Sequence, residues 1–153
     1  MRIAIVRLSS LGDVIGGMFV LQFIKKHYPG SSIEWFVDSR FSGILEHNPD
    51  IDKVHALPLK QYKKSPKTLI KKVREKRASL EDFDLIVDMQ GLIKSAVLTR
   101  CLGKKSVGFS YTSTKEKIAA LLYKKKVVTI ILLSYTTSKM WKQTLTFLNY
   151  LHR

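Results

Sequence analysis

The first residues that could do chemistry follow directly on an apolar segment at the start of the chain. Residues 3–6 are apolar, and the sequence then reads Ser9-Ser10-Leu11-Gly12-Asp13 before apolar residues resume at helical spacing. These residues therefore form the turn between a buried strand and a helix. Two interpretations remain open. Ser10 or Asp13 caps the helix, with Gly12 supplying permissive backbone angles, or the hydroxyls, the glycine and the helix N-terminus bind an anionic ligand.

Common nucleotide-binding loops do not match this turn. It lacks the Gly-Lys-Ser/Thr of a Walker A loop, and Gly12 and Gly16 stand four apart without the G-x-G pair of a dinucleotide site. Asp38 ends the second predicted strand, where NAD-binding proteins carry a carboxylate that binds ribose. The missing glycine pair argues against that role here.

Two later stretches carry further candidate ligands. Lys60, Lys63 and Lys64 lie just beyond a predicted strand end. They form either a solvated basic face or a patch that binds phosphate or carboxylate groups. Gln90 ends the strand in DLIVDMQG, and Lys94 stands in the first turn of the following helix. A lysine there opposes the helix dipole at a small cost, which indicates a ligand for it.

The elements that must position these residues alternate between strand and helix. The predicted strands cover residues 3–8, 33–37, 54–57, 84–89, 106–109 and 127–133. The predicted helices cover residues 13–28, 42–47, 66–78, 92–102, 114–124 and 137–151. This alternation predicts an α/β fold with a doubly wound, mostly parallel, Rossmann-like sheet covered by helices on both faces. In such sheets ligands bind at the carboxyl ends of the strands, the edge where both Asp13 and Gln90 are expected.

Composition bounds the class of protein and its partners. The chain has 153 residues, enough for one domain or for one domain and a fragment of another, and 45% of them are hydrophobic. Its net charge of +15 implies an acidic partner: nucleic acid, an anionic membrane surface or a phosphorylated substrate. The basic excess is concentrated in residues 60–77, with nine basic and one acidic residue, and in residues 103–126, with seven and one.

Cysteine usage and the apolar runs bound the compartment. Cys101 is the only cysteine, so the chain has no internal disulfide, and a reducing compartment fits best. Its apolar helical neighbours predict a core thiol, and no zinc-ligand spacing occurs. Arg7 interrupts the apolar start, which argues against a signal peptide. Residues 127–133 are far short of the roughly 20 residues of a membrane span, so we expect a soluble or surface-bound protein.

Three stretches in order resemble the bacterial lipopolysaccharide heptosyltransferases, most closely the heptosyltransferase I type. They read RLSSLGDVI at residues 7–15, DLIVDMQGLIKSA at residues 84–96 and GFSYTSTKEKIAALLYKKKV at residues 108–127. The resemblance implies the amino-terminal domain of a GT-B glycosyltransferase. Such an enzyme transfers heptose from ADP-heptose to the Kdo sugars of lipid A, with inversion, in synthesis of the lipopolysaccharide inner core. It implies neither a metal nor another cofactor.

The resemblance also implies residue roles. The general base of the family falls on Asp13, and its basic acceptor-binding residues fall on lysines where the family often has arginine. The family also usually has His and Pro after the aspartate, where this chain has Gly16 and Phe19. The predicted acceptor-binding residues are Ser9, Ser10, Gly12, Lys60, Lys63, Lys64, Gln90, Lys94 and Lys115.

Members of the family carry a second α/β domain that binds ADP-heptose. We expect residues 1–135 to form the acceptor-binding domain, and residues 136–153 to form a terminal helix that would lead into a donor-binding domain absent from this chain. The chain alone should then be inactive. The implied partners are Kdo-lipid A, ADP-heptose through the missing domain, and the anionic inner-membrane surface. The implied protein is a cytoplasmic monomer, peripheral on the cytoplasmic face of the inner membrane.

The charge alone also fits a second class, a non-catalytic basic α/β module that binds nucleic acid or another polyanion. Such a module would be helped by aromatic residues set among the basic ones for base stacking. Tyr62 is the only aromatic residue in residues 60–77. This favours compact phosphate sites, and no nucleic-acid partner is expected.

Overall fold

A six-stranded parallel sheet organises the domain. The computed structural model describes residues 1–62, 66–111, 116–123 and 125–127. The strands are β1 (Arg2–Val6), β2 (Ser32–Asp38), β3 (Lys53–Leu57), β4 (Leu85–Asp88), β5 (Ser106–Phe109) and β6 (Lys125–Val127). Their order is β3-β2-β1-β4-β5-β6, and every neighbouring pair is parallel. The chain thus starts in the middle of the sheet, builds one half and returns to build the other, which confirms the predicted Rossmann-like, doubly wound order.

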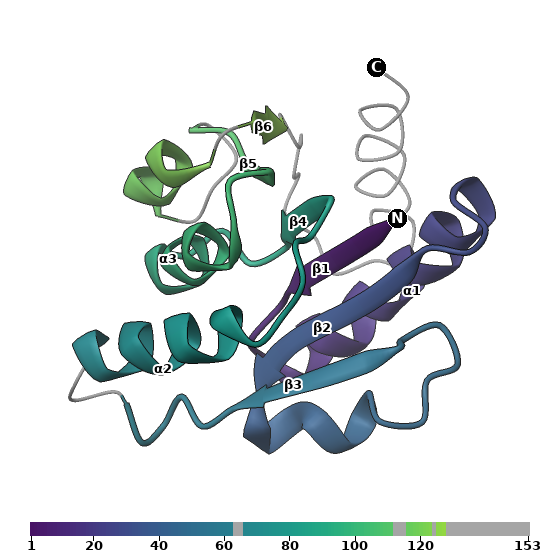
Figure 1. The fold of residues 1–153 in the computed structure, drawn as a ribbon, viewed down its shortest axis with the longest axis horizontal. Helices are drawn as coiled ribbons and strands as arrows, with labels where there is room; N and C mark the ends of the chain where they lie inside the picture. Colours follow the sequence, from purple (N-terminus) through teal and green to yellow (C-terminus); the bar gives the residue numbers. More distant parts are fainter. Residues whose placement is uncertain (63–65, 112–115, 124, 128–153) are drawn as a thin grey trace.

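Helices cover both faces of this sheet (Figure 1). They are α1 (Leu11–His27), α2 (Pro66–Ala78), α3 (Ile93–Leu102) and the 3₁₀ helices η1 (Ser39–Ile44) and η2 (Lys117–Leu122). Successive strand side chains point to opposite faces. Ile3 and Ile5 therefore pack in one apolar cluster with Leu21 of α1. Ala4 and Val6 pack in a second cluster with residues of α2 and α3. Among the described residues, no helix is both long and apolar enough to cross a membrane.

Most predicted elements are confirmed to within two residues, and α2 and β5 have the predicted bounds. The helix predicted over 42–47 is instead η1, which begins three residues earlier. It begins there because the Asp38 carboxylate accepts the Arg40 N–H at 3.1 Å directly at the end of β2. The strand predicted beyond Val127, the helix over 137–151 and the unit over 136–153 lie outside the described residues.

The α-helix predicted over 114–124 is wrong in its described part, where the structure has η2. Two anchors hold this segment. The Glu116 N–H donates to the Gly91 carbonyl at 3.3 Å, and the Tyr123 hydroxyl donates to the Asp88 carboxylate at 2.7 Å. A 3₁₀ helix rises about 2.0 Å per residue against 1.5 Å in an α-helix. A 3₁₀ helix therefore spans the distance between the two anchors with fewer residues than an α-helix would need.

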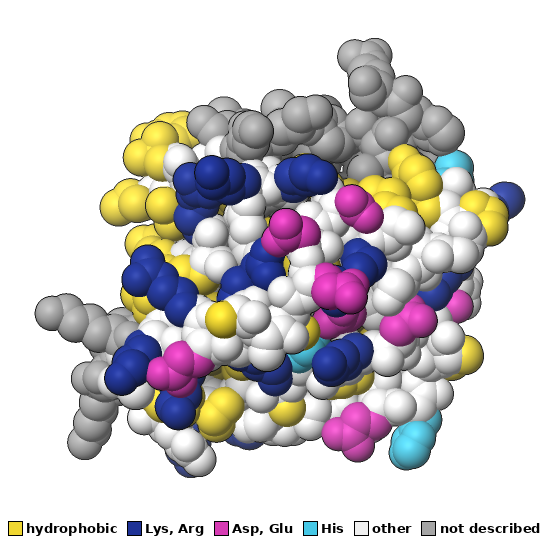
Figure 2. Space-filling model, in the orientation of Figure 1, with side chains coloured by type: hydrophobic (Ala, Val, Ile, Leu, Met, Phe, Trp, Pro, Cys, Tyr) yellow, Lys and Arg dark blue, Asp and Glu magenta, His cyan; other side chains and the backbone are white. Residues whose placement is uncertain are grey.

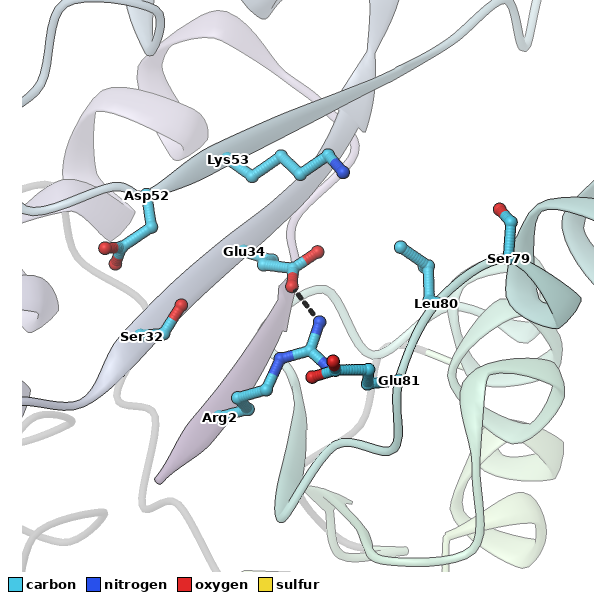
Figure 3. Close-up of a pocket in the computed structure, with 8 residues that line it drawn as sticks. All are labelled: Arg2, Ser32, Glu34, Asp52, Lys53, Ser79, Leu80 and Glu81. Carbon is cyan, nitrogen blue, oxygen red and sulfur yellow. Dashed lines mark hydrogen bonds and ion pairs between the residues drawn. The ribbon is translucent and has the colours of Figure 1, made fainter.

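A polar network lies between the sheet and α2, at the edge where the strands begin. Glu34 of β2 is buried there and pairs with Arg2 of β1, while His55 Nε2 lies 2.5 Å from Glu34 Oε2. The His55 ring stacks on Phe36 with 4.3 Å between ring centroids. Beside this network lies a polar cavity of about 410 Å³ (Figure 3). Its lining residues are Arg2, Ser32, Glu34, Asp52, Lys53, Ser79, Leu80 and Glu81.

We expect this network to make stability depend on pH. Burial lowers the pKa of His55, although its hydrogen bond to Glu34 opposes this, so His55 is neutral in the folded protein at pH 7. The unfolded chain takes up this proton near pH 6.5, more readily than the folded chain does. Stability should therefore fall as pH decreases below about 6.5. Thermal melting between pH 7.5 and 5.5 should show a smaller decrease in His55→Gln than in the unsubstituted chain.

The exposed His47 offers a matched control, because His47→Gln removes a histidine from the surface. This control should keep the pH dependence of the unsubstituted chain. Equal slopes of melting temperature against pH in His55→Gln and the unsubstituted chain would contradict the assignment. The window stays above the range in which Glu34 protonates: burial alone would raise the pKa of Glu34, but the hydrogen bonds from His55 and Arg2 hold it below its usual value.

Candidate active site

Two turns meet at the carboxyl edge of the sheet, between the neighbouring strands β1 and β4. The side-chain oxygen of Gln90 accepts the N–H groups of Leu8 and Ser9 at 2.7 and 3.1 Å. The side-chain nitrogen of Gln90 donates to Ser9 Oγ at 3.1 Å. The two turns predicted to share this edge are therefore cross-linked by one buried side chain, at the point where the sheet order reverses.

Asp13 takes part in starting α1, as one of the two interpretations of the turn predicted. Ser10 is the N-cap residue, and Asp13 Oδ2 accepts from the Ser10 N–H at 3.3 Å and from Ser10 Oγ at 3.4 Å. Both contacts are long for hydrogen bonds. The Asp13 side chain keeps 39% of its surface exposed. The capping role therefore leaves the carboxylate accessible at the edge of the sheet.

Arg7 is the residue of this site that the sequence did not assign. Its Nη2 lies 2.8 Å from Asp13 Oδ1, and its side chain is only 16% exposed. Burial lowers the pKa of Arg7, while the nearby charges of Asp13 and Asp88 oppose this. The sequence shows a basic residue directly after a buried strand. Its ion-pair partner Asp13 is 6 positions away, and Asp88, whose charge also acts on it, is 81 positions away.

The buried Asp88 carboxylate fixes the second turn through hydrogen bonds. Its Oδ1 accepts the N–H groups of Gln90 and Gly91 at 2.7 and 3.2 Å, and its Oδ2 accepts the Tyr123 hydroxyl. Burial raises the pKa of Asp88, and these hydrogen bonds oppose the shift. Gly91 has φ of +71°, a left-handed conformation that favours glycine. The turn is thus fixed by a buried acceptor and by the one residue type that its backbone tolerates without strain.

The start of α3 is closed by side chains of the protein itself. The Glu116 carboxylate accepts the Ile93 N–H at 2.5 Å, and Ser95 Oγ accepts the Leu92 N–H at 3.1 Å. Lys94 is exposed in the first turn. Burial alone would raise the pKa of Asp38, but the hydrogen bonds from Arg40, and behind them the charges of Arg40 and Lys94, lower it. The α3 N-terminus is therefore partly satisfied without a ligand.

The surroundings of Gly12 and Asp38 bear on two further predictions, the permissive backbone of Gly12 and ribose binding by Asp38. An added Cβ at Gly12 would meet nothing within 4 Å, and Gly12 has no positive φ. The suggestion that it supplies special backbone angles is therefore wrong, and the space before it is open to a ligand. Asp38 is bound at both oxygens by the Arg40 side chain, at 3.1 and 2.8 Å. This pairing argues further against ribose binding.

The predicted basic patch is only partly described. Lys60 is exposed in the turn after β3, whereas Lys63, Lys64 and Lys115 lie outside the described residues. Cys101 is half-buried and packs against the apolar cluster of α2 and α3, as expected for a core thiol. Within the described ranges, no group of three or more His, Cys, Asp or Glu side chains is placed to hold a metal ion.

Comparison with known proteins identifies the relatives of this domain. Residues 68–136 match the model of glycosyltransferase family 9 (heptosyltransferase). Lipopolysaccharide heptosyltransferase 1 of Campylobacter coli is 44% identical over 129 residues, which are 83% of this chain and 36% of that protein. The Pseudomonas aeruginosa protein of the same name is 32% identical over 82% of this chain and 37% of its own length. The chain thus spans well under half of these curated relatives.

Solved structures give the same result for the fold. The E. coli heptosyltransferase WaaC with ADP-2-deoxy-2-fluoro heptose has a TM-score of 0.83 and 25% identity, covering 99% of this chain and 49% of that one. A family 9 glycosyltransferase from Veillonella parvula has a TM-score of 0.78 at 22% identity, covering 96% of this chain and 41% of that one. Both likenesses extend over nearly the whole chain.

The fold and the matches together define the class: this chain belongs to glycosyltransferase family 9 (heptosyltransferase), and its Rossmann-like fold is that of the part of these enzymes that it matches. More particularly, the chain is a relative of the lipopolysaccharide heptosyltransferases of the heptosyltransferase 1 type and matches their amino-terminal part. The resemblance seen in the sequence is thereby confirmed. These relatives do not favour the alternative of a non-catalytic module that binds nucleic acid.

The link between the two turns predicts a stability effect. Gln90→Ala would leave the buried Leu8 N–H and the Ser9 N–H without their acceptor, which should lower the free energy of unfolding by about 1–3 kcal/mol. Urea denaturation measures this loss. Gln22→Ala, on the exposed side of α1, is the matched control and should change stability by less than about 0.5 kcal/mol. Equal small effects in both variants would show that the turns hold together without Gln90.

Proposed function

We propose that this chain is the acceptor-binding half of a heptosyltransferase that moves heptose from ADP-heptose to the Kdo sugars of lipid A. The observation that carries the proposal is the accessible Asp13 carboxylate at the β1–β4 edge of the sheet, in a relative of these enzymes. Ligands of doubly wound folds bind at this edge. A carboxylate there can reach the hydroxyl of a bound acceptor.

Asp13 acts in this proposal as the general base. An acceptor hydroxyl attacks the anomeric carbon of the donor heptose, its proton passes to Asp13, and ADP leaves with the electron pair of the broken bond. The Arg7 guanidinium holds Oδ1 and favours the ionised carboxylate, so Asp13 is ready to accept a proton. When Asp13 becomes neutral, Arg7 still lies in the field of Asp88.

The acceptor lies, in this proposal, across the two joined turns. Ser9, Ser10 and the open backbone at Gly12 present hydroxyl and amide groups, and Gln90 holds Ser9 in position. Lysines bind the acidic groups of the acceptor as point charges. They are Lys60, Lys63, Lys64, Lys94 and Lys115, of which Lys60 and Lys94 are described and exposed.

The remaining parts of the proposal concern what lies around the domain. ADP-heptose is bound by a second domain, without which this chain does not transfer heptose, because an acceptor needs a positioned electrophile. No metal or organic cofactor takes part. The protein works as a monomer in the cytoplasm, peripheral on the anionic face of the inner membrane where lipid A is built, and it has no nucleic-acid partner.

Two substitutions at Asp13 distinguish a role as general base from a role as helix cap. Residues 1–127 are fused to the donor domain of a full-length relative, and activity with ADP-heptose and Kdo-lipid A is followed as ADP release. Asn serves as well as Asp at a helix start but cannot accept the proton. Asp13→Asn should therefore melt near the temperature of the unsubstituted fusion, while turnover falls by on the order of 10²–10⁴. Asp13→Ala should lose both turnover and about 1 kcal/mol of stability.

The control for charge is Asp50→Asn, in the loop before β3 at the opposite edge of the sheet. It removes one carboxylate far from the joined turns and should retain full turnover. Near-normal turnover in Asp13→Asn would reduce Asp13 to a helix cap. A turnover loss of equal size in Asp50→Asn would indicate a general charge effect.

The basic residues should bind the acceptor electrostatically. Binding of Kdo-lipid A should weaken as salt increases, because attraction between exposed charges is screened over roughly 8 Å at physiological ionic strength. Lys63→Ala with Lys64→Ala should weaken binding by about 1 kcal/mol or more for each lost charge-assisted contact. Lys25→Ala with Lys26→Ala, near the end of α1, is the control of equal charge. Unchanged affinity in the first pair, with an intact circular dichroism spectrum, would leave these lysines as a solvated face.

A further inference from the structure

The most exposed apolar side chains of the described residues lie together on η2. Ile118 is 62% and Leu121 69% exposed, more than any other large apolar side chain in the described ranges. A 3₁₀ helix has three residues per turn, so side chains three apart lie above one another on the same face. Ala119 and Ala120 are fully buried, and Ala119 packs in a cluster with Ala96 of α3. The outward face of η2 therefore presents two apolar side chains, and the buried alanines anchor the helix beneath them.

A basic groove lies beside this pair. It has a volume of about 300 Å³ and is lined by Arg100, Lys104, Leu121, Leu122 and Tyr123, with no acidic residue. Arg100 stands in the last turn of α3, and Lys104 follows that helix. Neither cation has an ion-pair partner within the described part of the chain. Figure 2 shows hydrophobic side chains at the upper left, over η2, next to basic ones.

The charges decide what this surface fits. An apolar pair alone would suit many partners, but here it is flanked by unpaired cations. At the surface of an anionic bilayer, apolar side chains enter the boundary between headgroups and acyl chains, while Lys and Arg bind the lipid phosphates. The groove provides both halves of this contact side by side.

We infer that the surface formed by Ile118, Leu121, Arg100 and Lys104, the η2 surface, docks the domain on an anionic phospholipid bilayer. Ile118 and Leu121 insert below the headgroups, and Arg100 and Lys104 bind the phosphate groups in the headgroup layer above them. This extends the proposed function, in which the acceptor is a membrane lipid. It requires neither heptose transfer nor an acceptor in the membrane.

The first test measures binding of the full chain to vesicles that contain phosphatidylethanolamine and phosphatidylglycerol but no lipid A. Sedimentation should show binding to these vesicles and at least tenfold weaker binding to phosphatidylcholine vesicles. Ile118→Ser with Leu121→Ser should reduce the partition coefficient about tenfold at an unchanged melting temperature. Ile15→Ser with Phe19→Ser, two exposed apolar residues of α1, is the matched control and should stay within about twofold.

The second test separates the η2 surface from general charge attraction. Arg100→Gln with Lys104→Gln and Lys71→Gln with Arg74→Gln lower the net charge equally, the latter on the exposed side of α2. The first pair should weaken vesicle binding about tenfold and the second less than threefold. Equal losses in both pairs, or no binding of the unsubstituted chain, would overturn the inference. No donor or acceptor is present, so these outcomes leave the Asp13 and lysine experiments independent.

Discussion

The side chain of Gln90 holds the candidate active site together. Its amide joins the turn after β1 to the turn after β4, which lie 82 positions apart in the sequence between Leu8 and Gln90. The two strands are neighbours only because the sheet reverses its order at β1. Asp88 fixes the backbone of Gln90 from below, and Gly91 allows the chain to turn immediately afterwards. The position of Ser9, and with it the start of α1, follows from these contacts.

Charge at this edge is arranged around one half-buried cation. Arg7 lies in the fields of Asp13, which is accessible, and Asp88, which is buried. A buried guanidinium with one carboxylate partner would lose its only compensation when that partner is protonated. Arg7 pairs with Asp13 at 2.8 Å, and the charge of Asp88 adds a smaller contribution that favours the cation. The same carboxylate therefore combines a structural contact at the helix start with the proposed exchange of a proton.

The opposite edge of the sheet shows the contrast. There Arg2 pairs with Glu34 and Glu81 beside the polar cavity (Figure 3). The buried His55 bonds to the same Glu34 carboxylate. Such mutual pairing is typical of a network that shapes stability. At the carboxyl edge, Asp13 stays 39% exposed, and the space before Gly12 is open.

The sequence by itself determined the alternation of strands and helices, the doubly wound order and the edge at which the Asp13 and Gln90 turns meet. Apolar periodicity and the breakers between elements are local properties, so they can be recognised without the fold. Tertiary structure alone decided the partners of Arg7, the cross-link through Gln90 and the 3₁₀ form of η2. Each of these depends on groups brought together from distant strands, and the anchors at Glu116 and Tyr123 override the helical pattern between them. These contacts cannot be recognised from the local sequence, because their partners come together only when the sheet has assembled.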